Sequence, residues 1–123
     1  MTPLPRVSGP ERTGAALEFT LDLTPDLPVF DGHFPDTPIL PAVAQIDWAL
    51  RLARAHFPVP PGFRAAHALK FLRIVQPPVK LSLLLAPAGE HAVSFKYSHR
   101  GSACSSGRIE FTDDAPRPDR PLL

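Results

Sequence analysis

Apolar and polar residues alternate along several short segments of this chain. From Leu17 to Leu23 the odd positions are apolar, whereas the even positions Glu18, Thr20 and Asp22 are polar. A period of two is typical of a β-strand with one buried face, so residues 15–23 are predicted to form a strand. Similar patterns predict four further strands, over residues 67–75, 80–86, 92–99 and 102–112.

Residues 41–57 have the period of a helix instead. Pro41 suits the first helical position, where no backbone N–H is needed, and Pro58 follows the last turn. Apolar residues recur at spacings of three and four on two opposite sides: Val43, Ile46, Leu50, Ala53 and Phe57 on one, and Ala44, Trp48, Leu52 and Ala55 on the other. A helix that is apolar nearly all round is a buried helix. A strand, a buried helix and then an antiparallel meander predict an α+β fold.

The chain is predicted to hold one domain, because 123 residues suffice for a single core. Proline-containing segments at the two ends are expected to be a flexible arm (1–12) and a flexible tail (113–123) around a domain over 13–112. No stretch is long and apolar enough to span a membrane, and the N-terminus lacks the features of a signal peptide. Cys104 is the only cysteine, so the expected location is the cytoplasm.

The net charge of +1 hides an uneven distribution. Residues 11–47 hold seven acidic residues and one basic residue, whereas residues 51–108 hold nine basic residues and one acidic residue. An acidic protein partner and an ordinary solvated surface both explain this asymmetry. Nucleic acid is disfavoured as a partner, because no basic run is interleaved with aromatic residues.

The most distinctive segment runs from Phe30 to Trp48. A loop rich in proline carries His33 and leads into the predicted helix, where Asp47 follows His33 by fourteen residues. Histidine titrates nearest neutrality, and a carboxyl group in an apolar pocket makes a plausible partner for acid–base chemistry. Each residue also has a simpler explanation. A loop histidine is often structural, and Asp47 stands four residues before Arg51, the spacing of an ordinary helical ion pair.

This segment resembles the active-site segment of the FabA/FabZ-type 3-hydroxyacyl-[acyl-carrier-protein] dehydratases, which have the hot-dog fold. Their motif is G-H-F-P-x-x-P-[IV]-[ML]-P-G, with Glu or Asp fourteen residues after the histidine. The matching residues are Gly32, His33, Phe34, Pro35, Pro38, Ile39, Leu40 and Pro41, with Asp47 at the acidic position. The Q-x-D-W sequence from Gln45 to Trp48 is most similar to the ApeI-like branch, which is associated with aryl polyene synthesis.

The resemblance implies a curved antiparallel sheet wrapped around the helix, and a homodimer in which each site combines the histidine of one chain with the acid of the other. It implies dehydration of a 3-hydroxyacyl thioester to the trans-2-enoyl thioester, in fatty acid, polyketide or aryl polyene synthesis. His33 would remove the C2 proton, and Asp47 would protonate the departing hydroxyl. The implied substrate contacts are Phe34, Pro41, Ala42, Val43, Trp48 and Arg51. No cofactor or metal is expected.

The implied partner is an acyl carrier protein that bears a phosphopantetheine-linked acyl chain. Because carrier proteins of this pathway type are acidic, a basic rim is expected at the entrance to the site. The candidates for this rim are Arg64, Lys70, Arg73, Lys96 and Arg100.

Two positions depart from the family pattern. Ala42 replaces the usual glycine, whose N–H in the family donates to the thioester carbonyl; alanine keeps that N–H. Arg51 replaces a frequent glutamine, and a cation one turn from Asp47 favours the ionised carboxylate, which weakens it as a proton donor. Two other readings therefore stay open. One is a hot-dog thioesterase, against which the H-F-P-x-x-P loop argues, and the other is a non-catalytic subunit that binds acyl chains or carriers, with Asp47 locked by Arg51.

The remaining candidate residues carry weaker signals. His56, His67, His91 and His99 are scattered without the spacing of metal ligands. Cys104 alternates out of phase with the apolar positions of its predicted strand and has no evident activating neighbour, so a nucleophilic role is disfavoured.

Overall fold

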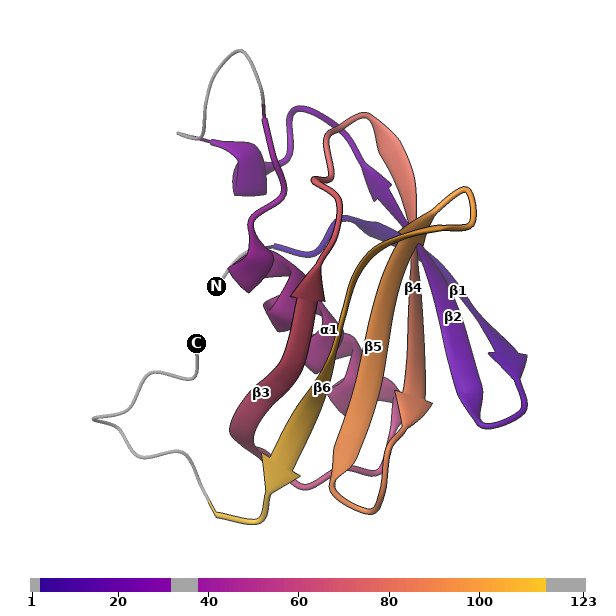
Figure 1. Cartoon of the computed structure of the whole chain (residues 1–123), viewed down its shortest axis with the longest axis vertical. Helices are drawn as coiled ribbons and strands as arrows, with labels where there is room; N and C mark the ends of the chain where they lie inside the picture. The colour runs from indigo at the N-terminus through magenta and orange to yellow at the C-terminus, as the bar shows by residue number, and fades with distance from the viewer. Residues whose placement is uncertain (1–2, 32–37, 115–123) are drawn as a thin grey trace.

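A computed structural model describes residues 3–31 and 38–114 of the chain. One six-stranded antiparallel sheet curves around a single long helix, as Figure 1 shows. The elements are β1 (Arg6–Thr13), β2 (Ala16–Leu23), the 3₁₀ helix η1 (Pro28–Phe30), α1 (Ala42–His56), β3 (Gly62–Phe71), β4 (Val79–Pro87), β5 (Ala92–His99) and β6 (Ser102–Thr112). The order across the sheet is β1-β2-β4-β5-β6-β3, so β1 and β3 are the two edges. This α+β architecture confirms the predicted hot-dog fold.

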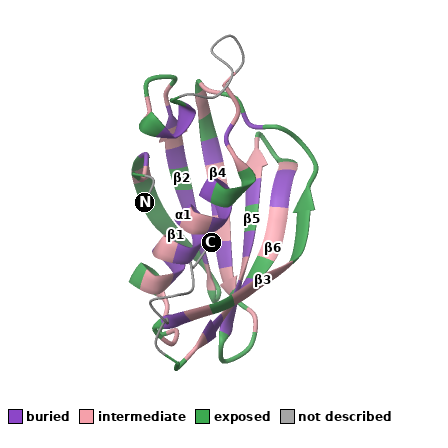
Figure 2. Cartoon of the chain, turned by 90° about the vertical axis from the view of Figure 1, so that its left-hand side faces the viewer, coloured by how far each residue is buried: buried purple, intermediate pink, exposed green. Residues whose placement is uncertain are grey.

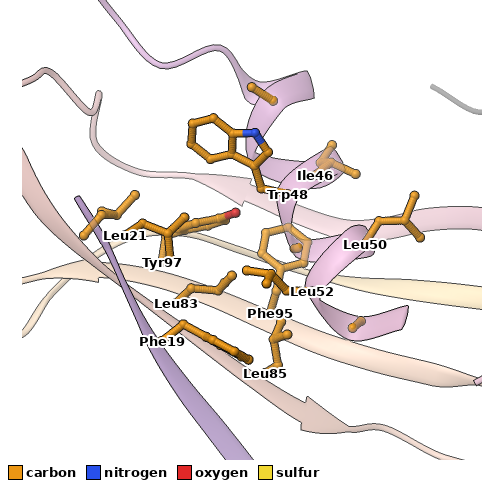
Figure 3. Close-up of a cluster of buried hydrophobic side chains, with 14 of the residues drawn as sticks. Phe19, Leu21, Ile46, Trp48, Leu50, Leu52, Leu83, Leu85, Phe95 and Tyr97 are labelled. Atoms are coloured by element: carbon orange, nitrogen blue, oxygen red, sulfur yellow. The ribbon is translucent and has the colours of Figure 1, made fainter. Parts of the chain in front are cut away.

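The core lies between α1 and the concave face of the sheet. Register pairs such as Phe19–Leu83 and Leu21–Leu81 place apolar side chains side by side on neighbouring strands. All four of these side chains are fully buried. Figure 3 shows three of them, Phe19, Leu21 and Leu83, on the strands that face the helix, together with Tyr97 of β5. The predicted alternation in β2, β4 and β5 is therefore the inward and outward alternation of a half-buried sheet.

Helix α1 is buried on most of its surface but not all round. Residues at spacings of three and four on one side stay open: Val43, Asp47, Arg51 and Arg54. The sheet covers only one side of the helix (Figure 2), and these four residues are exposed or half-buried. We call this row the open stripe of α1. The prediction of a helix apolar nearly all round missed it, although three of its four residues are charged.

Two edge strands differ from the sequence expectations. Arg6–Thr13 form β1 and pair with β2, where a flexible arm over 1–12 was expected. The third strand was expected over 67–75, but β3 begins at Gly62 and ends at Phe71. Leu72 to Pro78 instead form the connection to β4. Residues 115–123 of the expected flexible tail lie outside the described residues.

The phase of β6 changes at Cys104. Tyr97 pairs with Ser105, but the next residue, Ser98, pairs with Ala103, so Cys104 is the extra residue of a bulge. The bulge lets Cys104 and Ser105 both be buried. The out-of-phase position predicted for Cys104 is thereby explained, and burial raises the pKa of its thiol.

No helix in residues 3–31 and 38–114 is long and apolar enough to cross a membrane.

Candidate active site

Helix α1 begins without a side-chain cap. Pro41 is the N-cap residue, with extended backbone angles (φ −65°, ψ 149°), and neither it nor the first turn supplies a capping oxygen. The first N–H groups of a helix have no intrahelical partner, and they form the positive end of its dipole. The amide of Ala42, which is the first residue of α1, therefore has no intrahelical acceptor.

The start of α1 borders a cleft of about 250 Å³. Its walls are mostly apolar and come from both sides of the helix start: Ile39, Leu40, Ala42, Gln45, Phe71, Leu72, Arg73 and Ile74. We call it the α1 cleft. Backbone hydrogen bonds hold both walls, from the Leu40 amide to the Val75 carbonyl (2.8 Å) and from the Leu72 amide to the Cys104 carbonyl (2.8 Å). The cleft thus places apolar side chains next to the first residue of the helix.

Asp47 lies on the open stripe of α1, one helical turn after Val43. Its side chain is 20% exposed, and its Oδ2 is 3.6 Å from Nη1 of Arg51. This distance makes an ion pair but not a hydrogen bond. The helical pair suggested by the spacing of Asp47 and Arg51 does form, and it leaves Oδ2 of Asp47 without a hydrogen-bond partner in the described part of the chain.

A buried polar cluster, which sequence reasoning missed, lies directly behind the α1 cleft. The side-chain amide of Gln45 donates to the Leu40 carbonyl (3.2 Å) and accepts from the Ser105 hydroxyl (2.6 Å). The Tyr97 hydroxyl donates to the backbone carbonyl of Gln45 (2.7 Å). We call Gln45, Tyr97 and Ser105 the polar clamp. One signal in the sequence pointed to it: Tyr97 occupies an inward position of its strand, and a buried tyrosine hydroxyl usually has a hydrogen-bond partner.

Burial raises the pKa of Tyr97 well above its ordinary value, and the negative charge of Asp47 adds to this rise. The phenol therefore stays protonated and remains a donor.

The predicted site residues occupy three different environments. His33 and Phe34 lie outside the described residues. Pro41, Ala42 and Val43 lie at the exposed start of α1, and only Ala42 of these lines the cleft. The ring of Trp48 is fully buried in the core (Figure 3), and its Nε1 has no partner in the described part of the chain. The structure therefore gathers Ala42 and the cleft in one place and Asp47 with Arg51 in another, on the open stripe.

The other titratable residues serve local contacts. The ring of His56 packs edge-on against Phe19, with ring centres 5.0 Å apart. Nε2 of His67 is 3.1 Å from Oε1 of Glu110. No group of three or more His, Cys, Asp or Glu side chains that could hold a metal ion occurs within residues 3–31 and 38–114.

Of the five basic residues expected at the rim, Arg73 alone lines the α1 cleft. Arg64 lies near the opposite end of β3, where its Nε is 3.8 Å from Oε2 of Glu110. Arg100 lies in the turn between β5 and β6 and borders a separate cleft with Lys80 and His99.

The family model described as ApeI dehydratase (ApeI-like) matches residues 10–108. The chain belongs to the ApeI-like dehydratases. The match covers most of the described domain, including the start of α1 and the polar clamp. A dehydratase role follows from this membership. The comparison with curated proteins found no match.

Solved structures agree with the placement among ApeI-like dehydratases. The chain is 30% identical to a chain of the dehydratase heterocomplex ApeI:P from Xenorhabdus doucetiae, with a TM-score of 0.74 over 89% of this chain and 96% of that one. It is also 30% identical to an uncharacterized protein from Erwinia carotovora subsp. atroseptica, with a TM-score of 0.72 over 91% of this chain and 96% of that one.

A more distant structural likeness concerns the fold alone. The dehydratase domain from the CurK module of Curacin polyketide synthase is 13% identical, with a TM-score of 0.63. The match covers 94% of this chain but 44% of that chain. The hot-dog architecture is thus shared with a polypeptide about twice as long.

Proposed function

We propose that this ApeI-like dehydratase removes water from a 3-hydroxyacyl thioester carried by an acyl carrier protein, and gives the trans-2-enoyl thioester. The observation that carries the proposal is the uncapped start of α1, which opens into an apolar cleft. An acyl thioester needs an apolar channel for its chain and a donor for its carbonyl oxygen. The α1 cleft and the Ala42 amide offer both.

Two proton transfers balance the reaction. His33 removes the proton from C2, and the electron pair moves onto the thioester carbonyl as an enolate. The Ala42 amide, at the positive end of the helix, stabilises the negative charge that develops on this oxygen. Asp47 of a second subunit donates a proton to the C3 hydroxyl, directly or through water, and the C3–O bond breaks to release water. The proton held by His33 then returns to Asp47 through solvent.

The location of Asp47 supports a site shared between two subunits. Asp47 is on the open stripe and does not line the α1 cleft, whereas Ala42 does. Large apolar side chains stay exposed around both features, with Val43 at 53%, Leu72 at 64% and Ile74 at 66%. Leu72 and Ile74 line the same cleft, and exposed apolar side chains that lie together usually mark an interface. A second hot-dog subunit, packed against edge strand β3 and the open stripe, would cover them.

The products of one incubation separate the three readings of this protein. We expect the protein to convert a 3-hydroxyacyl carrier-protein thioester to the enoyl thioester. Mass spectrometry of the carrier protein would detect this loss of water. A thioesterase would release free carrier thiol instead, from saturated acyl thioesters as well. A non-catalytic subunit would leave both substrates unchanged.

Mixed variants test the shared site. His33→Ala and Asp47→Asn should each lose activity by several orders of magnitude, since acid–base catalysis alone supplies ~10²–10⁴-fold. Mixing the two variants should restore part of the activity, because hybrid dimers contain one intact site. No restoration, after subunit exchange has been shown with labelled chains, would contradict the shared site. Full activity of His33→Ala would contradict the dehydratase mechanism itself.

A further inference from the structure

Gln45 is an unusual residue for the first turns of a helix that faces a core. It is one of two buried polar residues among the described residues, with 4% exposure, and the other is its partner Ser105. Besides its backbone bonds within the helix, Gln45 makes hydrogen bonds to residues outside α1. Its side chain connects to Leu40 and Ser105, and its carbonyl accepts from Tyr97.

The two hydroxyl groups of the clamp come from one place in the sheet. Tyr97 and Ser105 are register partners on β5 and β6, so their side chains leave the sheet side by side on the face toward α1. Both then reach Gln45, from strands that are more than 50 residues away in the chain. Figure 3 shows the Tyr97 hydroxyl directed toward the helix. These two hydroxyl groups thus both bond to the helix at Gln45.

The clamp fixes the start of the helix in a different way from a cap. A capped helix is fixed at its start by a side chain of the N-cap residue, but Pro41 has none to offer. Gln45 instead reaches back past Pro41 to the carbonyl of Leu40. The entry of the chain into α1 is therefore tied to β5 and β6, while the first N–H groups of the helix have no intrahelical acceptor.

We propose that Gln45, held by Ser105 and Tyr97, is a positioning residue that fixes the Ala42 amide at the α1 cleft for the developing oxyanion. The inference rests on the proposed function and adds to it the residues that orient the donor. Donors for an oxyanion act only when they are held in place before the reaction. A misplacement of about 1 Å is enough to lower the rate strongly.

A stability role alone does not explain the polar character of the clamp. Burying an amide and two hydroxyl groups carries a desolvation penalty, and an apolar side chain of similar volume, such as methionine, would fill the same space without it. A fully satisfied buried network instead selects one arrangement of the elements that it joins. That arrangement is what an oxyanion donor requires.

Hydrogen exchange tests the positioning without reference to activity. The Gln45 amide donates to the Pro41 carbonyl (3.2 Å) and reports on the first turn. In Ser105→Ala we expect this amide to exchange about three- to tenfold faster, the change that loss of one hydrogen bond gives. Ser94→Ala is the matched control, because the Ser94 hydroxyl donates to a strand carbonyl, that of Ala86 (3.3 Å), and not to the helix. Unchanged exchange in Ser105→Ala, or equal acceleration in both variants, would overturn the proposal.

Kinetics on a thioester substrate test the catalytic consequence. Ser105→Ala and Gln45→Met should lower kcat about three- to tenfold with KM within twofold of wild type, because the donor is misplaced while the apolar cleft remains. Ser105→Thr, which keeps the hydroxyl, should recover most of the loss, and Ser94→Ala should retain kcat. Loss of kcat in Ser94→Ala to the same extent would reveal general loosening and refute the positioning role. An inactive wild-type protein would refute the proposed function alone. Hydrogen exchange would still show whether the polar clamp fixes the first turn of α1.

Discussion

Alkaline pH should destabilise the wild-type protein more than it destabilises a Tyr97→Phe variant. The Tyr97 side chain is fully buried, and its hydroxyl donates to the Gln45 carbonyl at 2.7 Å. Burial, and then the charge of Asp47, raise the pKa of Tyr97 far above its ordinary value of 10.0. In the unfolded chain the same phenol is in water and has its ordinary pKa. The two states therefore bind different numbers of protons above pH 10.

The sign and the size of the effect follow from this difference. Below pH ~10 both states hold the phenolic proton, so Tyr97 contributes its full stability there. Above it the unfolded state alone ionises, and each further pH unit lowers the free energy of unfolding by about 1.4 kcal/mol until the pH reaches the pKa of the folded state. Tyr97→Phe lacks this loss. At neutral pH the variant should be about 1 kcal/mol less stable than wild type, the usual net value of one hydrogen bond. The two proteins should thus become equally stable near pH ~11.

The assay can follow this residue alone, because Tyr97 is the only tyrosine and Trp48 the only tryptophan of the chain. Urea unfolding of both proteins, monitored by Trp48 fluorescence between pH 7 and pH 11, gives the two stability curves. Other titrating groups are common to both proteins and cancel in the difference. Tyrosinate absorbance should appear only with unfolding. If it rises near pH 10 while the fluorescence is still native, the Tyr97 hydroxyl is not held as described, and the reasoning on the polar clamp fails with it.

Two further predictions concern the sheet and the cleft. Gly107→Ala should lower the free energy of unfolding by about 1–3 kcal/mol in urea titrations, because a Cβ at this position would lie 2.7 Å from Cε2 of Phe95; unchanged stability would mean that the ring moves aside freely. Arg73→Glu should raise KM for a carrier-bound substrate but not for a pantetheine thioester, and 0.5 M salt should do the same, since exposed charges mainly set encounter and are screened. Arg64→Glu, at the other end of β3, is the control, and equal losses on both substrates would exclude carrier docking at Arg73.

The sequence predicts the fold well where burial is one-sided. The inner faces of β2, β4 and β5 pack on α1, so their residues alternate and their bounds were predicted to within a residue or so. Strand β1 has no buried face, because seven of its eight residues are exposed and the remaining one is half-buried. No period marks such a strand, and only its pairing with β2 creates it. The apolar residues Leu72 and Ile74 resembled a continuation of β3, yet they lie on the surface beside the α1 cleft.

In the candidate site, too, local features could be predicted from the sequence and contacts between distant segments could not. The spacing of His33 and Asp47, with the prolines between them, is a local signal and is readable in the sequence. The polar clamp is not local, since Gln45 and Ser105 are 60 residues apart and meet only because β5 and β6 pair under the helix. A bulge at Cys104 also sets the phase that turns Ser105 inward, and one sequence does not reveal a bulge. Sequence reasoning therefore found the residues proposed to react but not those proposed to hold them.

The ion pair of Asp47 and Arg51 bears on whether this chain is catalytic at all. A lock on Asp47 would need an interaction strong enough to resist substrate, but the pair spans 3.6 Å and its side chains are 20% and 26% exposed. The 3.6 Å separation is longer than a hydrogen bond, so the guanidinium of Arg51 does not hold this carboxylate oxygen through one. Arg51→Met should therefore retain most of kcat at neutral pH. An inactive wild type that gains dehydratase activity on Arg51→Met substitution would show that the arginine does lock the acid, and the reading as a non-catalytic subunit would replace the one proposed here.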